Sequence, residues 1–142
     1  MAAYEYYYPG SSSSMSADYS NTIGYRIPAS QLGIPTSIQT ANQLQEATNA
    51  LNQGTKVVEL QPIQPEIFEQ IPKQHFAEIR RITKLTGSQV SLHAPLIEPS
   101  GFAGEGNVWE PMNQEIAKNR LKEVVDRAHE LDPQGNVPVT FH

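Results

Sequence analysis

The sequence contains no cysteine, which excludes a disulfide framework and any thiolate chemistry. Long apolar runs are also missing, because no stretch approaches the roughly 18 residues that a membrane-spanning helix needs. The N-terminus has no basic segment followed by an apolar one, which is the pattern of a secretory signal. We therefore expect a soluble protein of the cytoplasm with no membrane partner.

Positive charge is scarce as well. Ten Lys and Arg stand against 15 Asp and Glu, which gives a net charge of -5. This excludes a general polyanion binder held by bulk electrostatics and leaves room only for a local basic patch. One such set, Lys73, Arg80, Arg81 and Lys84, falls on a predicted helix, where we expect a solvated face. The 142 residues suffice for one domain with a buried core.

Residues 1–21 differ in composition from the rest of the chain. Four tyrosines (Tyr4, Tyr6, Tyr7 and Tyr8) precede Pro9-Gly10 and a run of four serines. Such Pro-Gly-Ser content favours an unfolded chain. The tyrosines could also form an arm that stacks on a partner or a nucleic-acid base. We predict a disordered tail over residues 1–21 and one domain over residues 22–142.

Strand and helix patterns alternate through that domain. Short apolar or β-branched runs predict strands at residues 22–27, 56–60, 89–93 and 137–142. Apolar residues at three- and four-residue spacing predict three helical segments between the strands. The first is capped by Thr36 or Ser37 and ends at Gly54, the second is interrupted at Pro72 and ends at Gly87, and the third runs to Leu131. Residues 94–111 are predicted to be a long loop.

This alternation predicts an α/β fold with a parallel sheet and right-handed crossovers. A parallel strand normally has both faces buried, yet no helical pattern follows the last predicted strand. We therefore predict a partial (βα)8 TIM barrel, of the order β-α-β-α-β-α-β, in which this chain is the N-terminal half. A complete barrel has roughly 250 residues.

Two of the predicted strands end in histidine. His93 closes residues 89–93, and His142 closes residues 137–142. Neighbouring parallel strands end at the same edge of a sheet, where α/β proteins build their sites. Neutral imidazole is a good zinc ligand, so the pair predicts a metal site. Glu59, on the second predicted strand, is a candidate carboxylate for it.

The same segments resemble a known superfamily. His93-Ala94-Pro95 after a strand, Asn119-Arg120 on a helix and Phe141-His142 at a strand end are similar to the xylose-isomerase-like barrels. They most resemble the endonuclease IV-type apurinic/apyrimidinic endonucleases. The opening Ile23-Gly24-Tyr25-Arg26 is also similar to the start of that family, so the resemblance covers residues 22–142.

The resemblance implies a trinuclear zinc site that cuts the DNA backbone beside an abasic sugar. His93 and His142 would correspond to two zinc ligands, and clustered zinc ions generate hydroxide at neutral pH. Arg26 stands where the family has a histidine that contacts DNA, and it becomes a candidate substrate contact. The remaining ligands would lie in the missing C-terminal half. No catalytic residue is assigned in this chain, and alone it should have little or no hydrolase activity in DNA repair.

Two other functions remain open. Phe102 and Trp109 in the predicted loop are candidate substrate-binding residues, but the neighbouring Glu98, Glu105 and Glu110 suit a sugar better than a phosphate backbone. The alternative enzyme is thus a sugar isomerase or epimerase on the same barrel. The other alternative is a non-catalytic half-barrel. Its open strand edges and apolar inner face would pair with the missing half or with a second copy.

Overall fold

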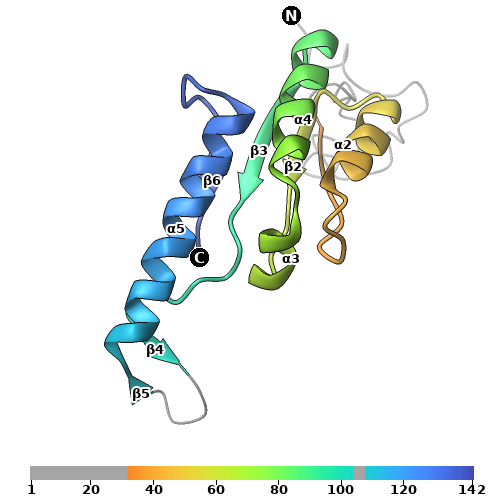
Figure 1. Cartoon of the computed structure of the whole chain (residues 1–142). Coiled ribbons are helices and arrows are strands. Elements are labelled where there is room, and N and C mark those ends of the chain that lie inside the picture. The colour runs from red at the N-terminus through yellow and green to blue at the C-terminus, as the bar shows by residue number, and fades with distance from the viewer. Residues whose placement is uncertain (1–31, 104–107) are drawn as a thin grey trace, which may run out of the picture.

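The structure is a computed structural model that describes residues 32–103 and 108–142. The predicted tail and the predicted strand 22–27, with Arg26, lie outside these residues. The described part is mixed α/β, with four helices and a four-stranded parallel sheet of order β1-β2-β3-β6 (Figure 1). The strands are β1 (Gly33–Pro35), β2 (Val57–Leu60), β3 (Gln89–His93) and β6 (Val139–Thr140). The helices are α2 (Gln43–Asn52), α3 (Pro65–Gln70), α4 (Lys73–Thr86) and α5 (Pro111–Leu131).

The first strand of this sheet is not the predicted one. β1 pairs with β2 in the register Ile34 to Val58, and β3 takes the other edge of β2. The predicted strand at residues 22–27 lies outside the described part of the chain and stays a prediction. The three residues of β1 were missed because a strand this short, ending in proline, shows no alternation.

The helix α2 begins later than predicted. Its N-cap is Asn42, whose side chain accepts a hydrogen bond from the Gln45 backbone N–H. The predicted cap Thr36 is instead buried in the turn after β1, where its hydroxyl donates to the Gln43 side chain. The same hydroxyl accepts from the Gln61 N–H at 2.9 Å. Serine and threonine suit turns as well as caps, and only the tertiary contact distinguishes the two uses.

Other element boundaries are confirmed. Gly54 follows α2 with φ +93°, and Gly87 ends α4 with φ +62°, the left-handed conformation that commonly closes helices. Pro72 separates α3 from α4. The strand β3 has the predicted bounds, residues 89–93.

The last strand is shorter than predicted at both ends, and Pro138 accounts for its late start. The Leu92 N–H donates to the Pro138 carbonyl at 2.9 Å, and the Ala94 N–H donates to Thr140 at 2.8 Å. The next bond of this parallel ladder would run from an N–H at position 138 to the Val90 carbonyl. Proline has no N–H, so β6 begins at Val139.

The predicted loop 94–111 contains a hairpin. Its strands β4 (Phe102–Ala103) and β5 (Val108–Trp109) pair antiparallel, with Phe102 opposite Trp109. The Trp109 indole N–H donates to the Ser100 carbonyl at 2.9 Å. Strands of two residues have no detectable period, which is why the sequence pattern indicated only a loop.

The helices cover one face of the sheet. Val58, Leu60 and Leu92 are fully buried against a core that the helices supply. The helical core residues are Ala47, Ala50, Phe68, Phe76, Ile79, Ala117, Val124, Ala128 and Leu131. Because side chains alternate along a strand, Glu59, Ser91, His93 and Thr140 point to the opposite face. In the described residues no helix covers that face, and the prediction of an apolar inner face is wrong because it is largely polar.

The buried Arg127 joins α5 to α3. Its guanidinium carbon lies 4.3 Å from the centre of the Phe68 ring, and the group also donates to the Phe68 carbonyl. An ion pair with Glu123 at 2.6 Å compensates its charge. A buried arginine needs such paired and stacked surroundings, so α5 is held in one position against the rest of the core.

Candidate metal-binding histidine pair

The topology brings His93 and His142 together, as predicted. His93 ends β3 and is paired in register with Thr140 of β6, and His142 follows two residues later. The two Nε2 atoms are 2.9 Å apart, and the ring centres are 4.7 Å apart. Both imidazoles therefore stand at the carboxyl ends of adjacent parallel strands, on the face that the helices leave open.

The hydrogen bonds of His93 determine its tautomer. Its Nδ1 lies 3.1 Å from the Ala94 carbonyl, and because a carbonyl only accepts, Nδ1 carries the hydrogen. In the neutral ring Nε2 then has a free lone pair, to which the Nε2–H of His142 donates. The lone pair of His93 is thus directed at its neighbour in the pair, at the position where a shared ligand would bind.

The pair fits two positions of a tetrahedral zinc site. Two nitrogens bonded to one zinc at about 2.0–2.1 Å stand about 3.3 Å from each other. The observed 2.9 Å is shorter than this value, so the two rings would have to separate slightly to share an ion. The tautomer of His142 must also change, so that its Nε2 presents a lone pair.

The described residues do not complete such a site. Among residues 32–103 and 108–142, no group of three or more His, Asp or Glu side chains is placed to hold a metal. Glu59 lies on the same open face, half-exposed, but it is in register with Ser91, two residues before His93. It is therefore on the predicted face without being beside the imidazoles. A metal held by the pair needs further ligands from outside the described residues.

The strand ends carry negative rather than positive charge. In the four strands of the sheet, in residues 94–98 and in Phe141-His142 there is no Lys or Arg. Glu98 accepts hydrogen bonds from the Ser100 hydroxyl and from its N–H at 2.9 Å. These two bonds hold the pKa of Glu98 below its usual value, and the bond from the Ser100 hydroxyl has the larger effect. This carboxylate therefore stays ionised.

The aromatic residues predicted to bind substrate lie elsewhere. Phe102 and Trp109 are 43% and 49% exposed on the hairpin. Figure 1 shows the hairpin beyond the carboxyl ends of the strands, at the first turns of α5 and separated from the C-terminal residue. The structure does not bring these two side chains to the imidazole pair. Phe102 instead borders a small cavity of about 140 Å³ with Leu96 and Ile116.

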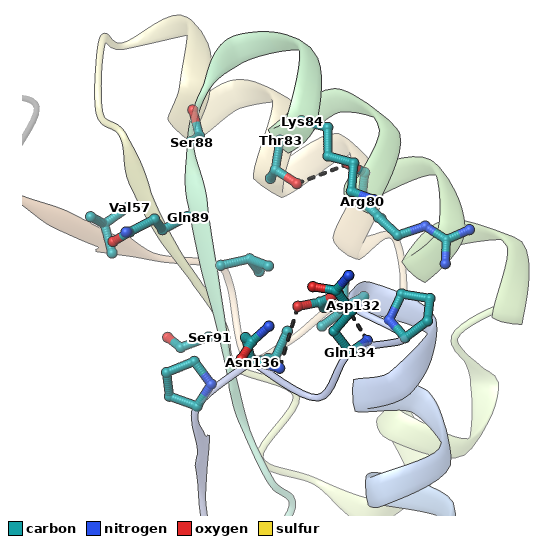
Figure 2. Close-up of a pocket in the computed structure, with 15 residues that line it drawn as sticks. Val57, Arg80, Thr83, Lys84, Ser88, Gln89, Ser91, Asp132, Gln134 and Asn136 are labelled. Atoms are coloured by element: carbon teal, nitrogen blue, oxygen red, sulfur yellow. Dashed lines mark hydrogen bonds between the residues drawn. The ribbon is translucent and has the colours of Figure 1, made fainter.

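A larger groove was missed by the sequence reasoning. It has a volume of about 610 Å³ and lies between α4, the first residues of β3 and the loop after α5 (Figure 2). Arg80 and Lys84, predicted to be a solvated face, line it. Their four-residue spacing was the available signal, because it places both on one side of a helix. Whether that side of α4 faces open solvent or the groove depends on the tertiary structure.

No protein-family model, curated protein or solved structure significantly matches this chain. None of the helices in residues 32–103 and 108–142 is long and apolar enough to cross a membrane.

Proposed function

We propose that this chain is the first half of a xylose-isomerase-like (βα)8 barrel and supplies two histidine ligands to a metal site at the barrel mouth. The observation that carries the proposal is the 2.9 Å separation of the His93 and His142 Nε2 atoms. An all-parallel sheet with its helices on one face and strands β1, β2, β3 and β6 in chain order is compatible with such a half-barrel.

Zinc is the proposed metal, because imidazole suits it and the chain has no thiolate. When bound, zinc supplies a Lewis acid and lowers the pKa of a bound water. The chain's own contribution is to hold two nitrogens on rigid strand ends. The Ala94 carbonyl orients the His93 ring by its hydrogen bond to Nδ1, the nitrogen that would not bind the metal. Acceptors in the second coordination sphere orient metal-bound histidines in the same way.

The lead reaction is phosphodiester hydrolysis beside an abasic site in DNA. It is supported by the resemblance of His93-Ala94-Pro95 and Phe141-His142 to the endonuclease IV-type enzymes, since both segments lie at strand ends or directly after them. The other zinc ligands would come from the second half of the barrel. The chain by itself is therefore expected to bind metal weakly and to have little or no activity.

A sugar isomerase or epimerase is the second candidate, and one observation favours it. Glu59 and Glu98 lie at or after the strand ends, and these segments contain no Lys or Arg. The two carboxylates would repel the phosphates of a DNA backbone. Carboxylates accept hydrogen bonds from sugar hydroxyls. An uncharged sugar would therefore meet no electrostatic penalty at this edge of the sheet.

Metal binding tests the site. Co²⁺ is a spectroscopic probe for zinc, and its visible absorption on titration into the full chain reports the ligands. His93→Ala and His142→Ala should each remove most of the Co²⁺ binding, because each deletes half of the ligand pair. His129→Ala is the matched control, since His129 is exposed on α5 and bonds only to the Val125 carbonyl. Equal affinities in all four proteins would refute the proposed site.

Activity tests the reaction. The protein isolated from its source cells, with any chain that accompanies it, is assayed for zinc-dependent nicking of an abasic duplex and for aldose–ketose interconversion. Chelator-sensitive nicking supports the endonuclease, and interconversion supports the sugar enzyme. If neither appears while Co²⁺ binding is normal, the enzymatic proposal fails and the metal serves assembly of the half-barrel.

A further inference from the structure

The groove of about 610 Å³ lies at the amino end of β3, the opposite end of the strand from His93. Figure 2 shows α4 with Arg80, Thr83 and Lys84 on one wall. Asp132, Gln134 and Asn136 stand on the other wall, in the loop after α5. Ser88 directly precedes β3, and Gln89 and Ser91 belong to it. A groove of this volume is in the range of sites for small molecules.

The α4 wall carries two positive charges, and neither forms an ion pair with a described residue. Arg80 is half-buried, and in the described part of the chain its guanidinium makes no hydrogen bond and no ion pair. Lys84 follows one turn later on the same side and is likewise without an ion-pair partner among those residues. The neighbouring Arg81 behaves differently, because Glu78 holds it at 2.6 Å. Among the described residues that line the groove, Arg80 and Lys84 are therefore the cations without an ion pair.

Asp132 is the one carboxylate among the described residues that line the groove, and its oxygens already accept hydrogen bonds. Asp132 accepts from the Gln134 N–H at 3.1 Å and from the Asn136 N–H at 3.3 Å. These bonds, chiefly the one from Gln134, hold the pKa of Asp132 below its usual value, and the nearby charge of Lys84 adds to the effect. Asp132 thus organises the loop, and the loop offers the amide groups of Gln134 and Asn136 to the groove.

Pro138 keeps the groove open. A β6 strand extended toward its N-terminus would pair with Val90 and close the gap between β3 and the loop. Because Pro138 cannot donate to the Val90 carbonyl, the chain departs from β3 at this point, and Val137 and Pro138 line the groove instead. The opening follows from the sequence of β6 rather than from loose packing.

We infer that this groove binds a small anionic molecule, with its phosphate or carboxylate group held between Arg80 and Lys84 and its polar remainder against Gln89 and Gln134. Guanidinium and ammonium groups together are the usual receptors for such anions. The net charge of the chain is -5, so its overall electrostatics would disfavour an anion, and saturable binding would require a local cationic site such as this groove. The inference does not depend on the histidine pair.

Titration of the full chain with inorganic phosphate, pyrophosphate and citrate, followed by amide NMR shifts, tests the groove. We expect saturable shifts at Ser88, Gln89 and Gln134 with at least one of these anions. Arg80→Gln should weaken that binding about tenfold or more, because a charge-assisted contact is lost. Arg81→Gln is the matched control, being the adjacent residue of the same type with its own partner. It should leave the affinity unchanged.

Lys84→Gln gives a second measurement if Arg80→Gln proves to be unfolded by circular dichroism, because Lys84 is exposed and its replacement disturbs no packing. A preference for pyrophosphate over citrate assigns the ligand to the phosphates, and the reverse assigns it to the carboxylates. The inference is overturned if none of the three anions binds saturably. Equal losses in Arg80→Gln and Arg81→Gln, or shifts centred on His93 and His142, would overturn it as well.

Discussion

At the scale of single residues, two backbone constraints shape the edge of the sheet and the hairpin. Pro138 lacks an N–H, and β6 therefore begins only at Val139. Gly101 allows the turn before β4, with φ +91°. A Cβ at this position would lie 3.0 Å from the Gln114 Cβ and 3.2 Å from the Glu110 carbonyl oxygen. Only glycine combines this dihedral angle with so little space.

Gly101→Ala should therefore destabilise the hairpin by more than the left-handed conformation alone accounts for. The conformational cost is about 1–2 kcal/mol for a residue with a Cβ, and the crowding at Gln114 adds to it. Fluorescence of Trp109, the only tryptophan of the chain, should shift to the red as its bond to Ser100 is released.

Gly54→Ala is the control for this prediction. Gly54 has nearly the same dihedral angle, φ +93°, but nothing lies within 4 Å of an added Cβ. It should show the conformational cost in urea unfolding without the change at Trp109. If Gly101→Ala leaves the emission of Trp109 unchanged, the close approach around Gly101 is not restrictive.

At the scale of elements, the loop from α5 to β6 depends on the charge of Asp132. Its carboxylate accepts the N–H groups of Gln134 and Asn136, and its pKa is lowered from the ordinary 3.8. A group with a lowered folded pKa stabilises the protein above its unfolded pKa, and this stabilisation is lost as the pH falls through the folded pKa. The loop should therefore loosen in acid below about pH 4.

Asp132→Ala should make this contribution visible. At neutral pH the variant should unfold at a lower urea concentration than the natural chain, and the difference should shrink as the pH falls below the ordinary pKa of an aspartate. Urea midpoints measured across that range give the comparison. Glu130→Ala, an exposed neighbour on α5, should show no such convergence. A difference for Asp132→Ala that stays constant with pH would mean that the carboxylate charge does not hold the loop.

At the scale of the whole molecule, association should occur through a strand edge rather than through the open face. That face carries Glu59, Ser91, His93 and Thr140, which hydrate well. In β6 the backbone groups of residues 138 and 140 turn toward β3, so those of Val139 turn to the outer edge. No described strand pairs with that edge, and unpaired edges are templates for another chain.

Val139→Pro should therefore reduce self-association, since it deletes the outward N–H without removing a bond to β3. Val139→Ala is its control, because it trims the side chain and keeps the N–H. Sedimentation across a hundredfold concentration range should show the natural chain and Val139→Ala associating and Val139→Pro remaining monomeric. Identical masses for all three would show that the β6 edge is not the contact.

Much of the local structure followed from residues that act within a few positions. Gly54, Pro72 and Gly87 set helix ends by their own dihedral preferences, and the β-branched run of β2 and the residues of β3 predicted their strands. His93 was placed at a strand end by that pattern alone. The sequence could not identify β1, because Gly33–Pro35 becomes a strand only by pairing with Val57–Glu59.

The sequence by itself determined where helices stop, which residues alternate along β3 and that His93 ends a strand, because these properties depend on short-range dihedral preferences and side-chain periodicity. Only the tertiary structure decided that the His93 and His142 nitrogens meet at 2.9 Å. It also decided that the open face is polar and that Arg80 and Lys84 face the loop around Asp132. Those outcomes depend on the register and packing of segments far apart in the chain, which no local preference specifies.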